Sequence, residues 1–252
     1  MSPFAVPEAM HIGILGAGRL GSTLAVLLSR AGHTVQLCKR GVLPTAECDG
    51  VLLTVPDGAL EDVAKQWTGP FPVLHCSGAL TVDVLRPLSP AGSFHPLMTF
   101  PGPTNAIPDL TGVPAVIDGD PEAQAFGQAV ADALGMHILE VPGDRRLYHA
   151  AAVLSGNFAT VLLAHAAAAL EAAGVPHDQA GTALLPLALE SLRNAAHDPA
   201  GSLTGPVARG DDAVVQSHRD ALADVGLTDC LELYDNLTRA TRELHRGKLR
   251  SD

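Results

Sequence analysis

The chain has 252 residues, of which 47% are hydrophobic and 17% charged, so its composition is that of a folded globular protein and not of a disordered one. Its formal net charge is -11 at pH 7, and no block of Lys and Arg interleaved with aromatic residues interrupts the sequence, which excludes a typical nucleic-acid-binding surface. The four cysteines form no CxxC pair and have no metal-ligand spacing. We therefore expect no metal, no disulfide framework and a cytoplasmic location.

The amino-terminal stretch MSPFAVPEAM lacks the basic and apolar regions of a signal peptide, so we expect a short disordered tail. A second stretch, from Ala150 to Ala173, is rich enough in alanine and leucine to suggest a membrane helix. Polar residues interrupt it at Ser155, Asn157, His165 and Glu171. The interruptions favour a buried helix of a soluble protein, with no membrane partner.

Up to residue 143, short apolar runs alternate with helix-like stretches. The expected strands are His11–Leu15, Thr34–Cys38, Val51–Val55, Val73–Cys76, Gly92–His95, Pro114–Ile117 and His137–Val141. The expected helices are Leu20–Ala31, Ala59–Trp67, Val82–Leu88 and Glu122–Leu134. This alternation predicts an α/β fold with a Rossmann-like, mostly parallel sheet.

From residue 144 onward the strand signals stop, and four helical stretches follow: Arg145–Ala173, Asp178–Ala196, Asp212–Val225 and Asp229–Arg246. We therefore predict a dinucleotide-binding domain over residues 1–143. An all-α domain that binds substrate or dimerises is expected over residues 144–252.

A glycine-rich turn follows the first expected strand. Its sequence, Gly16-Ala17-Gly18-Arg19-Leu20-Gly21, fits the G-x-G-x-x-G pattern of dinucleotide-binding proteins and opens a helix. In that pattern the first glycine allows the tight turn, the second lets a pyrophosphate approach the backbone, and the third lets the helix lie close to the strand. Free N–H groups and the helix dipole attract the phosphates. A purely structural turn is the alternative.

The end of the second expected strand indicates which dinucleotide is bound. An NAD site usually places Asp or Glu near this position, to bind the ribose hydroxyls. Here the residues are Cys38, Lys39 and Arg40, and the two cations could neutralise a 2′-phosphate. An ordinary exposed basic pair is the alternative. The pattern favours NADP(H).

Two further turns fall at carboxyl ends of expected strands, where such sheets bind their ligands. They are Val55-Pro56-Asp57 and Ser77-Gly78. We expect their backbone to line the ribose next to the nicotinamide. The alternative is that they only close the strands.

The candidate catalytic residues lie on both sides of the expected domain boundary. His95 ends a strand beside a proline and could exchange the proton that accompanies hydride transfer, or could merely hydrogen-bond its loop. Ser155 and Asn157 form a polar patch in an apolar helix and could orient a substrate, or be satisfied by neighbouring helices. Arg209 lies between glycine-rich breaks and could hold a substrate carboxylate.

The order of several motifs resembles a family of bacterial proteins that join a Rossmann-like domain to a helical domain of unknown function. The motifs are G-A-G-R-L-G, V-P-D, S-G, F-H-P-L-M-T-F, Y-H-A-A-A, S-G-N-F and L-T-G-P-V-A-R-G-D. More distantly, the chain resembles the 6-phosphogluconate dehydrogenase-like superfamily, which includes pyrroline-5-carboxylate reductase, ketopantoate reductase and prephenate dehydrogenase. That resemblance implies a substrate between the domains and a homodimer formed through the helical domain.

The same resemblance bears on the catalytic residues. Prephenate dehydrogenases carry a similar H-P motif near the nicotinamide, which supports His95. Hydroxyacid dehydrogenases of the superfamily use a lysine on the first long helix, and here no lysine lies between His149 and Gly174.

The sequence therefore predicts an NADP-dependent oxidoreductase. It would transfer a hydride between NADPH and a small, anionic carbonyl, imine or hydroxy-acid substrate. A non-catalytic NADP-binding sensor and a deazaflavin-linked NADP reductase remain as alternatives.

Overall fold

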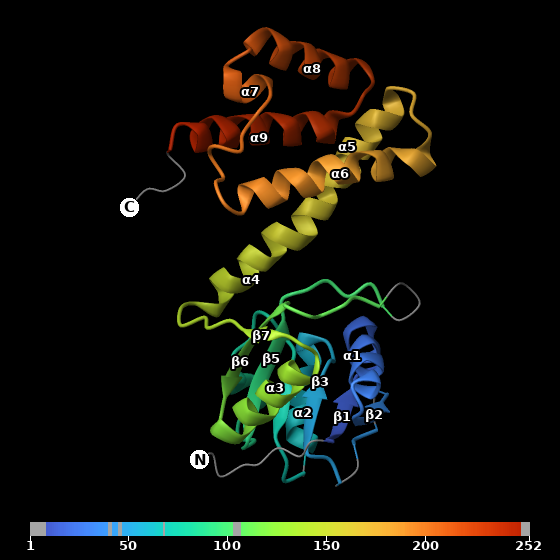
Figure 1. Ribbon diagram of the computed structural model, residues 1–252, viewed down its shortest axis with the longest axis vertical. Coiled ribbons are helices and arrows are strands. Elements are labelled where there is room, and N and C mark those ends of the chain that lie inside the picture. Colours follow the sequence, from blue (N-terminus) through green and yellow to red (C-terminus); the bar gives the residue numbers. More distant parts are fainter. Residues whose placement is uncertain (1–8, 40–41, 45–46, 68, 103–106, 248–252) are drawn as a thin grey trace. The chain divides into compact units, whose positions relative to one another are not determined.

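A computed structural model describes residues 9–39, 42–44, 47–67, 69–102 and 107–247. The chain forms two compact units, Met1–Gly156 and Asn157–Asp252, and each is described by itself (Figure 1).

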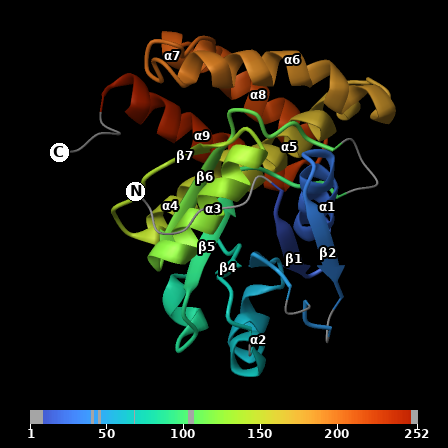
Figure 2. The same ribbon diagram turned by 60° about the horizontal axis from the view of Figure 1, so that its bottom comes forward.

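The first unit is built on a seven-stranded sheet with the order β2-β1-β3-β4-β5-β6-β7. Its strands are β1 (His11–Leu15), β2 (Thr34–Cys38), β3 (Gly50–Leu53), β4 (Val73–His75), β5 (Ala91–Pro96), β6 (Pro114–Gly119) and β7 (His137–Ile138). Neighbouring strands are parallel except β5 and β6, which pair antiparallel with His95 opposite Val116. Figure 2 shows β2 at one edge of this sheet. The prediction of a Rossmann-like, mostly parallel sheet is confirmed.

Alternating side chains divide the core between the two faces of the sheet, because successive residues of a strand point to opposite sides. Leu52 of β3 packs with α1 (Arg19–Arg30) and α3 (Pro121–Ala133), whose buried residues include Leu24 and Phe126. Its neighbour Leu53 packs on the other face, against Leu60 of α2 (Leu60–Gln66). The carboxyl ends of β1, β3, β4 and β5 therefore lie side by side at one edge of a rigid, two-sided core.

Several element boundaries differ from the sequence expectations. Strand β3 ends at Leu53 and not at Val55, because Pro56 has no N–H and restricts the residue before it. Strand β7 is two residues long, since only His137 and Ile138 pair with β6. The helix expected over Val82–Leu88 is a 3₁₀ turn, Val82–Leu85, and another 3₁₀ turn, Asp57–Ala59, precedes α2.

The sequence places the domain boundary after residue 143, whereas the compact units divide after Gly156. The reason is that α4 (Arg145–Val153) contacts the loop at the end of β4, where Arg145 donates a hydrogen bond to the Ser77 carbonyl oxygen. A π-helical segment, Leu154–Phe158, follows α4 and spans the boundary.

The second unit is all-helical. Its helices are α5 (Ala159–Ala172), α6 (His177–Ala195), α7 (Pro206–Arg209), α8 (Asp212–Asp224) and α9 (Thr228–His245). Helix α7 was not expected from the sequence, since its single turn is too short for a periodic pattern. A bidentate ion pair from Arg219 to Asp235 joins α8 to α9, with N–O distances of 2.6 and 2.9 Å.

The expectation of a buried helix over Ala150–Ala173 is wrong: no residue of α4, the π-helical segment or α5 is buried. Within the second unit, helix α5 packs on α6 and α9. Among the described residues, Arg145–Ala172 is the one helical stretch whose length and composition would suffice to cross a membrane.

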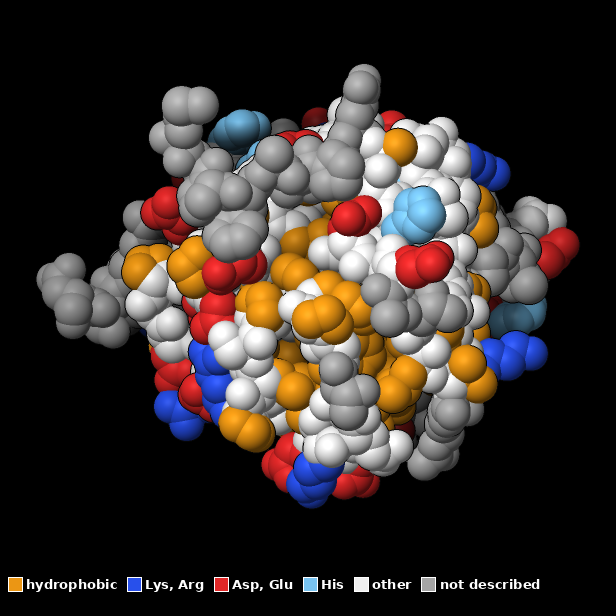
Figure 3. Space-filling view, turned by 90° about the horizontal axis from the view of Figure 1, so that it is seen from below, with side chains coloured by type: hydrophobic (Ala, Val, Ile, Leu, Met, Phe, Trp, Pro, Cys, Tyr) orange, Lys and Arg blue, Asp and Glu red, His pale blue; other side chains and the backbone are white. Residues whose placement is uncertain are grey.

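Seen from below, the face nearest the viewer carries hydrophobic side chains near its centre (Figure 3). Acidic and basic side chains lie mainly around them.

Candidate functional site

The glycine turn between β1 and α1 has three glycines in three different environments. Gly16 has φ +118°, and a Cβ atom there would lie 2.8 Å from the Thr54 carbonyl carbon and oxygen. A Cβ atom at Gly21 would overlap the Gly16 carbonyl oxygen and the Thr54 hydroxyl. At Gly18, by contrast, a Cβ atom would meet no described atom within 4 Å. Gly16 and Gly21 are thus required by packing, whereas Gly18 faces open space.

Thr54 at the end of β3 fixes this turn. Its hydroxyl donates to the Gly16 carbonyl oxygen at 2.7 Å and also lies 3.2 Å from the Leu15 carbonyl oxygen. Helix α1 then begins at Arg19 with no side-chain cap on Gly18 and no acidic residue in its first turn. The amino-terminal N–H groups and the helix dipole therefore meet no competing carboxylate of the first turn, which suits an anionic ligand.

A pocket of about 930 Å³, here called the turn pocket, opens at this point. Its lining comes from the glycine turn, the loop after β2, the end of β3 and α2: Leu15, Gly16, Ala17, Gly18, Leu43, Thr54, Val55, Pro56, Gly58, Ala59, Asp62, Val63 and Gln66. Five residues predicted from the sequence to bind the cofactor, Gly16, Ala17, Gly18, Val55 and Pro56, thus line one pocket. Arg19, Leu20 and Gly21 form the first turn of α1 beside it.

The end of β2 reaches the same turn, because the Gly16 N–H donates to the Cys38 carbonyl oxygen at 2.9 Å. Cys38 is buried, and Lys39 directly after it is exposed. Arg40, the second predicted cation, lies outside the described residues. Asp62 supplies a carboxylate to the pocket lining but forms an ion pair with Lys65 at 3.4 Å.

Asp57 and Ser77 connect the ends of β3 and β4. The Ser77 hydroxyl donates to Asp57 at 2.8 Å and accepts from the N–H groups of Ala79 and Leu80 at 3.2 and 3.1 Å. The predicted residues Asp57 and Ser77 therefore form one hydrogen-bonded bridge, next to Pro56 of the turn pocket.

His75 is buried below this bridge and supports it. Its Nε2 lies 3.2 Å from the Thr81 carbonyl oxygen, which can only accept, so Nε2 carries the proton. Its Nδ1 accepts from the Ser77 N–H at 3.2 Å. Burial, followed by the Arg145 cation, lowers the pKa of His75 to about 4. The ring is therefore neutral at pH 7, with one fixed tautomer, and holds the Ser77 loop in place.

His95 lies beyond the same loop, at the end of β5. Its Nδ1 lies 2.6 Å from the Tyr148 hydroxyl of α4, and the two rings meet edge to face with an interplanar angle of 88°. Burial, then Arg145 and then His149 lower the pKa of His95 to about 4, so this imidazole is also neutral at pH 7. Burial raises the pKa of Tyr148, whereas Arg145 lowers it.

Gly78 explains how the two rings come close to the loop. A Cβ atom at this position would lie 2.7 Å from His95 Nε2 and 2.7 Å from His149 Cδ2. A glycine is therefore needed for the backbone to lie against both imidazoles.

Arg145 places a positive charge beside His95 and Tyr148. Its guanidinium donates to the Ser77 carbonyl oxygen at 3.2 Å and its Cζ lies 5.9 Å from the centre of the Tyr148 ring. Burial lowers the pKa of Arg145, and its Nε is buried with no hydrogen-bond partner in the described structure. None of the ion pairs formed among the described residues includes Arg145.

The other predicted catalytic residues are distributed over both units. Ser155 lies in the π-helical segment at the end of the first unit and is exposed. Asn157 and Arg209 belong to the second unit, Arg209 as the exposed last residue of α7.

Sequence reasoning did not assign roles to Tyr148 and Arg145, although both stand in the first turn and a half of the helix that leaves the sheet. A cation and a tyrosine at such a helix start were the available signal. Among the residues that the structure describes, no group of three or more His, Cys, Asp or Glu could hold a metal ion.

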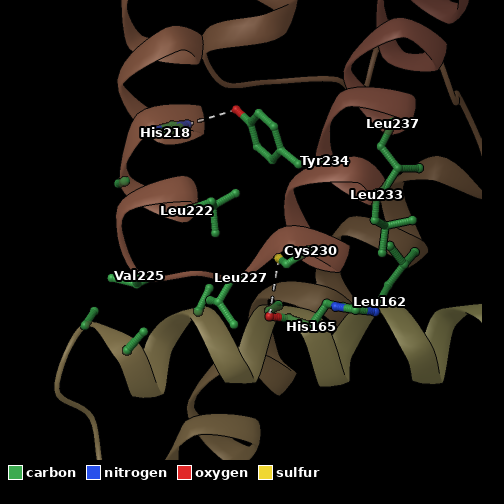
Figure 4. A pocket seen from close by; sticks show the side chains of 15 residues that line it. Leu162, His165, His218, Leu222, Val225, Leu227, Cys230, Leu233, Tyr234 and Leu237 are labelled. Atoms are coloured by element: carbon green, nitrogen blue, oxygen red, sulfur yellow. Dashed lines mark hydrogen bonds between the residues drawn. The ribbon is translucent and has the colours of Figure 1, made fainter.

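A second cavity, of about 600 Å³, lies within the second unit between α5, α8 and α9 (Figure 4). It is lined mainly by alanine and leucine, with a hydrogen bond of 2.9 Å between His218 Nδ1 and the Tyr234 hydroxyl at its wall. No lysine or arginine is among the residues that line this apolar cavity. The turn pocket and the residues around Arg145, both in the first unit, are therefore the better candidates for phosphate binding and proton transfer.

Several known proteins similar to this chain carry the names of oxidoreductases. A glycerol-3-phosphate dehydrogenase [NAD(P)+] of Azorhizobium caulinodans is 28% identical over 185 residues, which are 57% of this chain and 54% of that protein. This chain thus spans about half the length of that relative.

Solved structures are similar over almost the whole chain. A protein of Bacteroides fragilis, provisionally named an NADP oxidoreductase, is 25% identical with a TM-score of 0.77 and coverage of 94% of this chain and 99% of that one. A 1-pyrroline-5-carboxylate reductase of Streptococcus pyogenes is 19% identical, with a TM-score of 0.65 and coverage of 94% and 100%. A reductive aminase of Aspergillus terreus, solved with NADPH and ethyl levulinate, is 18% identical, with a TM-score of 0.65 and coverage of 93% and 94%.

These likenesses confirm the fold of the 6-phosphogluconate dehydrogenase-like superfamily, with a Rossmann-like sheet followed by helices. A family model described as "Domain of unknown function (DUF2520)" matches residues 113–241, about half of the chain. The chain belongs to the DUF2520 family.

Proposed function

We propose that this chain is an NADP-dependent oxidoreductase that transfers a hydride between NADPH and a small carbonyl, imine or hydroxy-acid substrate. The observation that carries the proposal is the turn pocket, where the uncapped amino terminus of α1 and the open side of Gly18 meet. A pyrophosphate needs N–H donors and close backbone approach, and this turn offers both. The dehydrogenase and oxidoreductase names of similar proteins support the same class of reaction.

Each part of the cofactor has candidate contacts. Gly16, Ala17, Gly18, Arg19, Leu20 and Gly21 would hold the pyrophosphate through their backbone. Val55, Pro56, Asp57, Ser77 and Gly78 would line the path toward His95, since the carboxyl ends of β3, β4 and β5 are adjacent. When bound, NADPH supplies the hydride that reduces the substrate carbon.

The preference for NADPH over NADH rests on the end of β2. Cys38 stands where a ribose-binding carboxylate would be expected, and exposed Lys39 follows it beside the turn. The one carboxylate in the described lining of the turn pocket, Asp62, is already paired with Lys65. A cation without a competing carboxylate favours a 2′-phosphate.

His95 would take part in the proton transfer that accompanies hydride transfer, and its neutral state at pH 7 leaves one ring nitrogen able to accept a proton while the other carries one. Ser155 and Asn157 would orient the substrate, and Arg209 would hold its anionic group.

We further propose that the protein is a cytoplasmic homodimer formed through the second unit. Helix α6 exposes leucines at helical spacing, with Leu185, Leu189 and Leu192 exposed by 43%, 44% and 58%. Such a row of apolar side chains is typical of a surface that a second copy covers. Light scattering of the purified protein tests this assembly, and a monomer at all concentrations would contradict it.

The function is tested in two steps. Calorimetric titration with NADPH and NADH should show tighter binding of NADPH, and the difference should shrink in Lys39→Ala but not in the control Arg193→Ala, which removes an exposed cation of α6. A panel of 2-oxo acids, ketones and cyclic imines is then screened by the absorbance of NADPH. If the protein binds neither NADPH nor NADH, the proposal is overturned. Tight NADPH binding without hydride transfer to any panel member would instead favour a sensor.

A further inference from the structure

We infer that the Tyr148 hydroxyl, paired with His95, is the group that gives the proton to the substrate when it is reduced. This inference rests on the proposed function and adds a residue to its chemistry. It follows from three observations within the first unit: the hydrogen bond between the two side chains, the position of the pair beside the loop that ends β4, and the cation next to them.

The hydrogen bond comes first. The Tyr148 oxygen lies 2.6 Å from His95 Nδ1, which is short for a bond between a hydroxyl and an imidazole nitrogen. A neutral imidazole has one N–H and one bare nitrogen, so it can donate through Nδ1 while Nε2 accepts. In that tautomer the Tyr148 oxygen accepts the hydrogen bond from His95, so the hydroxyl proton of Tyr148 is not used in this bond and can point toward a substrate. His95 then serves as the partner that returns a proton to the phenol.

The position of the pair comes second. Asp57 follows Pro56 of the turn pocket, and it is hydrogen-bonded to Ser77 at 2.8 Å. The next residue, Gly78, has its backbone against His95 Nε2. A continuous set of contacts therefore leads from the turn pocket to the Tyr148–His95 pair. A dinucleotide whose pyrophosphate lies on the glycine turn would extend along this edge toward the pair.

The cation comes third. Arg145 lies over the Tyr148 ring, is half-buried and forms no ion pair among the described residues. A partly desolvated positive charge stabilises a nearby phenolate more strongly than it would in water. The other titratable groups near the pair are His75, His149, Asp57 and Asp118. Arg145 is therefore a positioning and electrostatic residue for Tyr148, and does not itself exchange the proton.

The proton balance closes with one proton from solvent. As the hydride and its electron pair reach the substrate carbon, the electrons of the C=O or C=N double bond move to the oxygen or nitrogen. That atom takes the proton of Tyr148. The phenolate then takes the Nδ1 proton of His95, which regains one at Nε2 from solvent, and exchange of the ring protons with solvent restores the Nδ1–H tautomer for the next turnover. The net change is consumption of NADPH and one proton, with release of NADP⁺ and the reduced product.

A spectroscopic test needs no known substrate, because the chain has only two tyrosines. Tyr234→Phe leaves Tyr148 alone, and Tyr148→Phe leaves Tyr234, whose bond of 2.9 Å to His218 in the second unit makes it a matched control. Each variant is titrated with base and the ultraviolet absorbance of tyrosinate is followed. Saturation with NADP⁺, whose nicotinamide is cationic, should lower the pKa of Tyr148 and leave that of Tyr234 unchanged. A Tyr148 pKa that does not respond to bound NADP⁺ would overturn the inference.

A kinetic test follows with any panel substrate that is turned over. Tyr148→Phe should lower kcat by about 10²–10⁴-fold with the Kd for NADPH unchanged, whereas Tyr234→Phe should match the parent. Full turnover by Tyr148→Phe would disprove the role of Tyr148 and leave the oxidoreductase intact. A parent protein that binds no NADPH would instead disprove the proposed function.

Discussion

The Tyr148 hydroxyl lies 2.6 Å from Nδ1 of His95, although the two residues are 53 positions apart in the sequence. The antiparallel strand pair β5–β6 and the helix α4 that follows β7 bring them together. A second histidine–tyrosine pair, His218 with Tyr234, has a comparable bond of 2.9 Å but lies in the wall of the apolar cavity of the second unit. The difference between the pairs is their surroundings, since only Tyr148 lies beneath a half-buried arginine.

Substitution by alanine should weaken NADPH binding at Gly18 and should lower the stability of the fold at Gly21. A methyl group at Gly18 enters open space where the pyrophosphate would lie, so Gly18→Ala should fold normally and bind NADPH at least 10-fold more weakly. A methyl group at Gly21 overlaps the Gly16 carbonyl oxygen and the Thr54 hydroxyl, so Gly21→Ala should lose about 1–3 kcal/mol of unfolding free energy. Thermal unfolding and calorimetric titration of both variants distinguish the effects. Equal behaviour of the two would contradict the assigned roles.

Much of the fold could be predicted from the sequence because its strands and glycine turn are local patterns. Strands β1 and β2 begin and end where the alternation of apolar residues places them, and Gly16, Gly18 and Gly21 mark the turn by their spacing. The ends of β3 and β7 were harder to predict from the sequence, because they depend on pairing partners and on a proline.

The site could be predicted only in part, for a similar reason. Asp57 and Ser77 were each expected beside the cofactor, but their hydrogen bond joins two loops 20 residues apart. Arg145 looks like an ordinary helix residue until its contact with the Ser77 carbonyl shows that α4 packs on the loop after β4. Burial of a cation and the distance between two rings are tertiary properties, which no local pattern contains.

His75 should make the protein sensitive to acid. Its pKa is about 4 in the folded state against 6.5 ordinarily, so the unfolded chain takes up a proton first as the pH falls. The free energy of unfolding should therefore decrease between about pH 6.5 and pH 4, by about 3 kcal/mol from this residue. His75→Asn should be less stable at pH 7, because the bond to the Thr81 carbonyl is lost, but should show a shallower pH dependence.

Urea unfolding at several pH values measures this slope. The control His137→Asn replaces an exposed histidine of β7 and keeps His75, so it should retain the slope of the parent. An identical slope in His75→Asn would mean that the buried imidazole does not carry the effect.

Gly78 should be needed mainly for the geometry of the proton-transfer pair, because its proposed contact with the cofactor is through the backbone, which alanine keeps. A methyl group there would lie 2.7 Å from both His95 Nε2 and His149 Cδ2, and the imidazoles, as side chains, can move away. Gly78→Ala should therefore remain folded with a nearly unchanged Kd for NADPH, while displacement of His95 weakens its 2.6 Å bond to Tyr148. Turnover of a panel substrate should fall by about 10-fold or more, since misplaced proton donors lose most of their contribution.

The matched control is Gly143→Ala, where a Cβ atom would meet no described atom within 4 Å. That variant should keep both binding and turnover. Nuclear magnetic resonance of the histidine rings gives an independent measure, because the His95 signals should shift in Gly78→Ala and stay in place in Gly143→Ala. Unchanged His95 signals and full turnover in Gly78→Ala would show that the loop can accept a side chain, and that Gly78 does not position the pair.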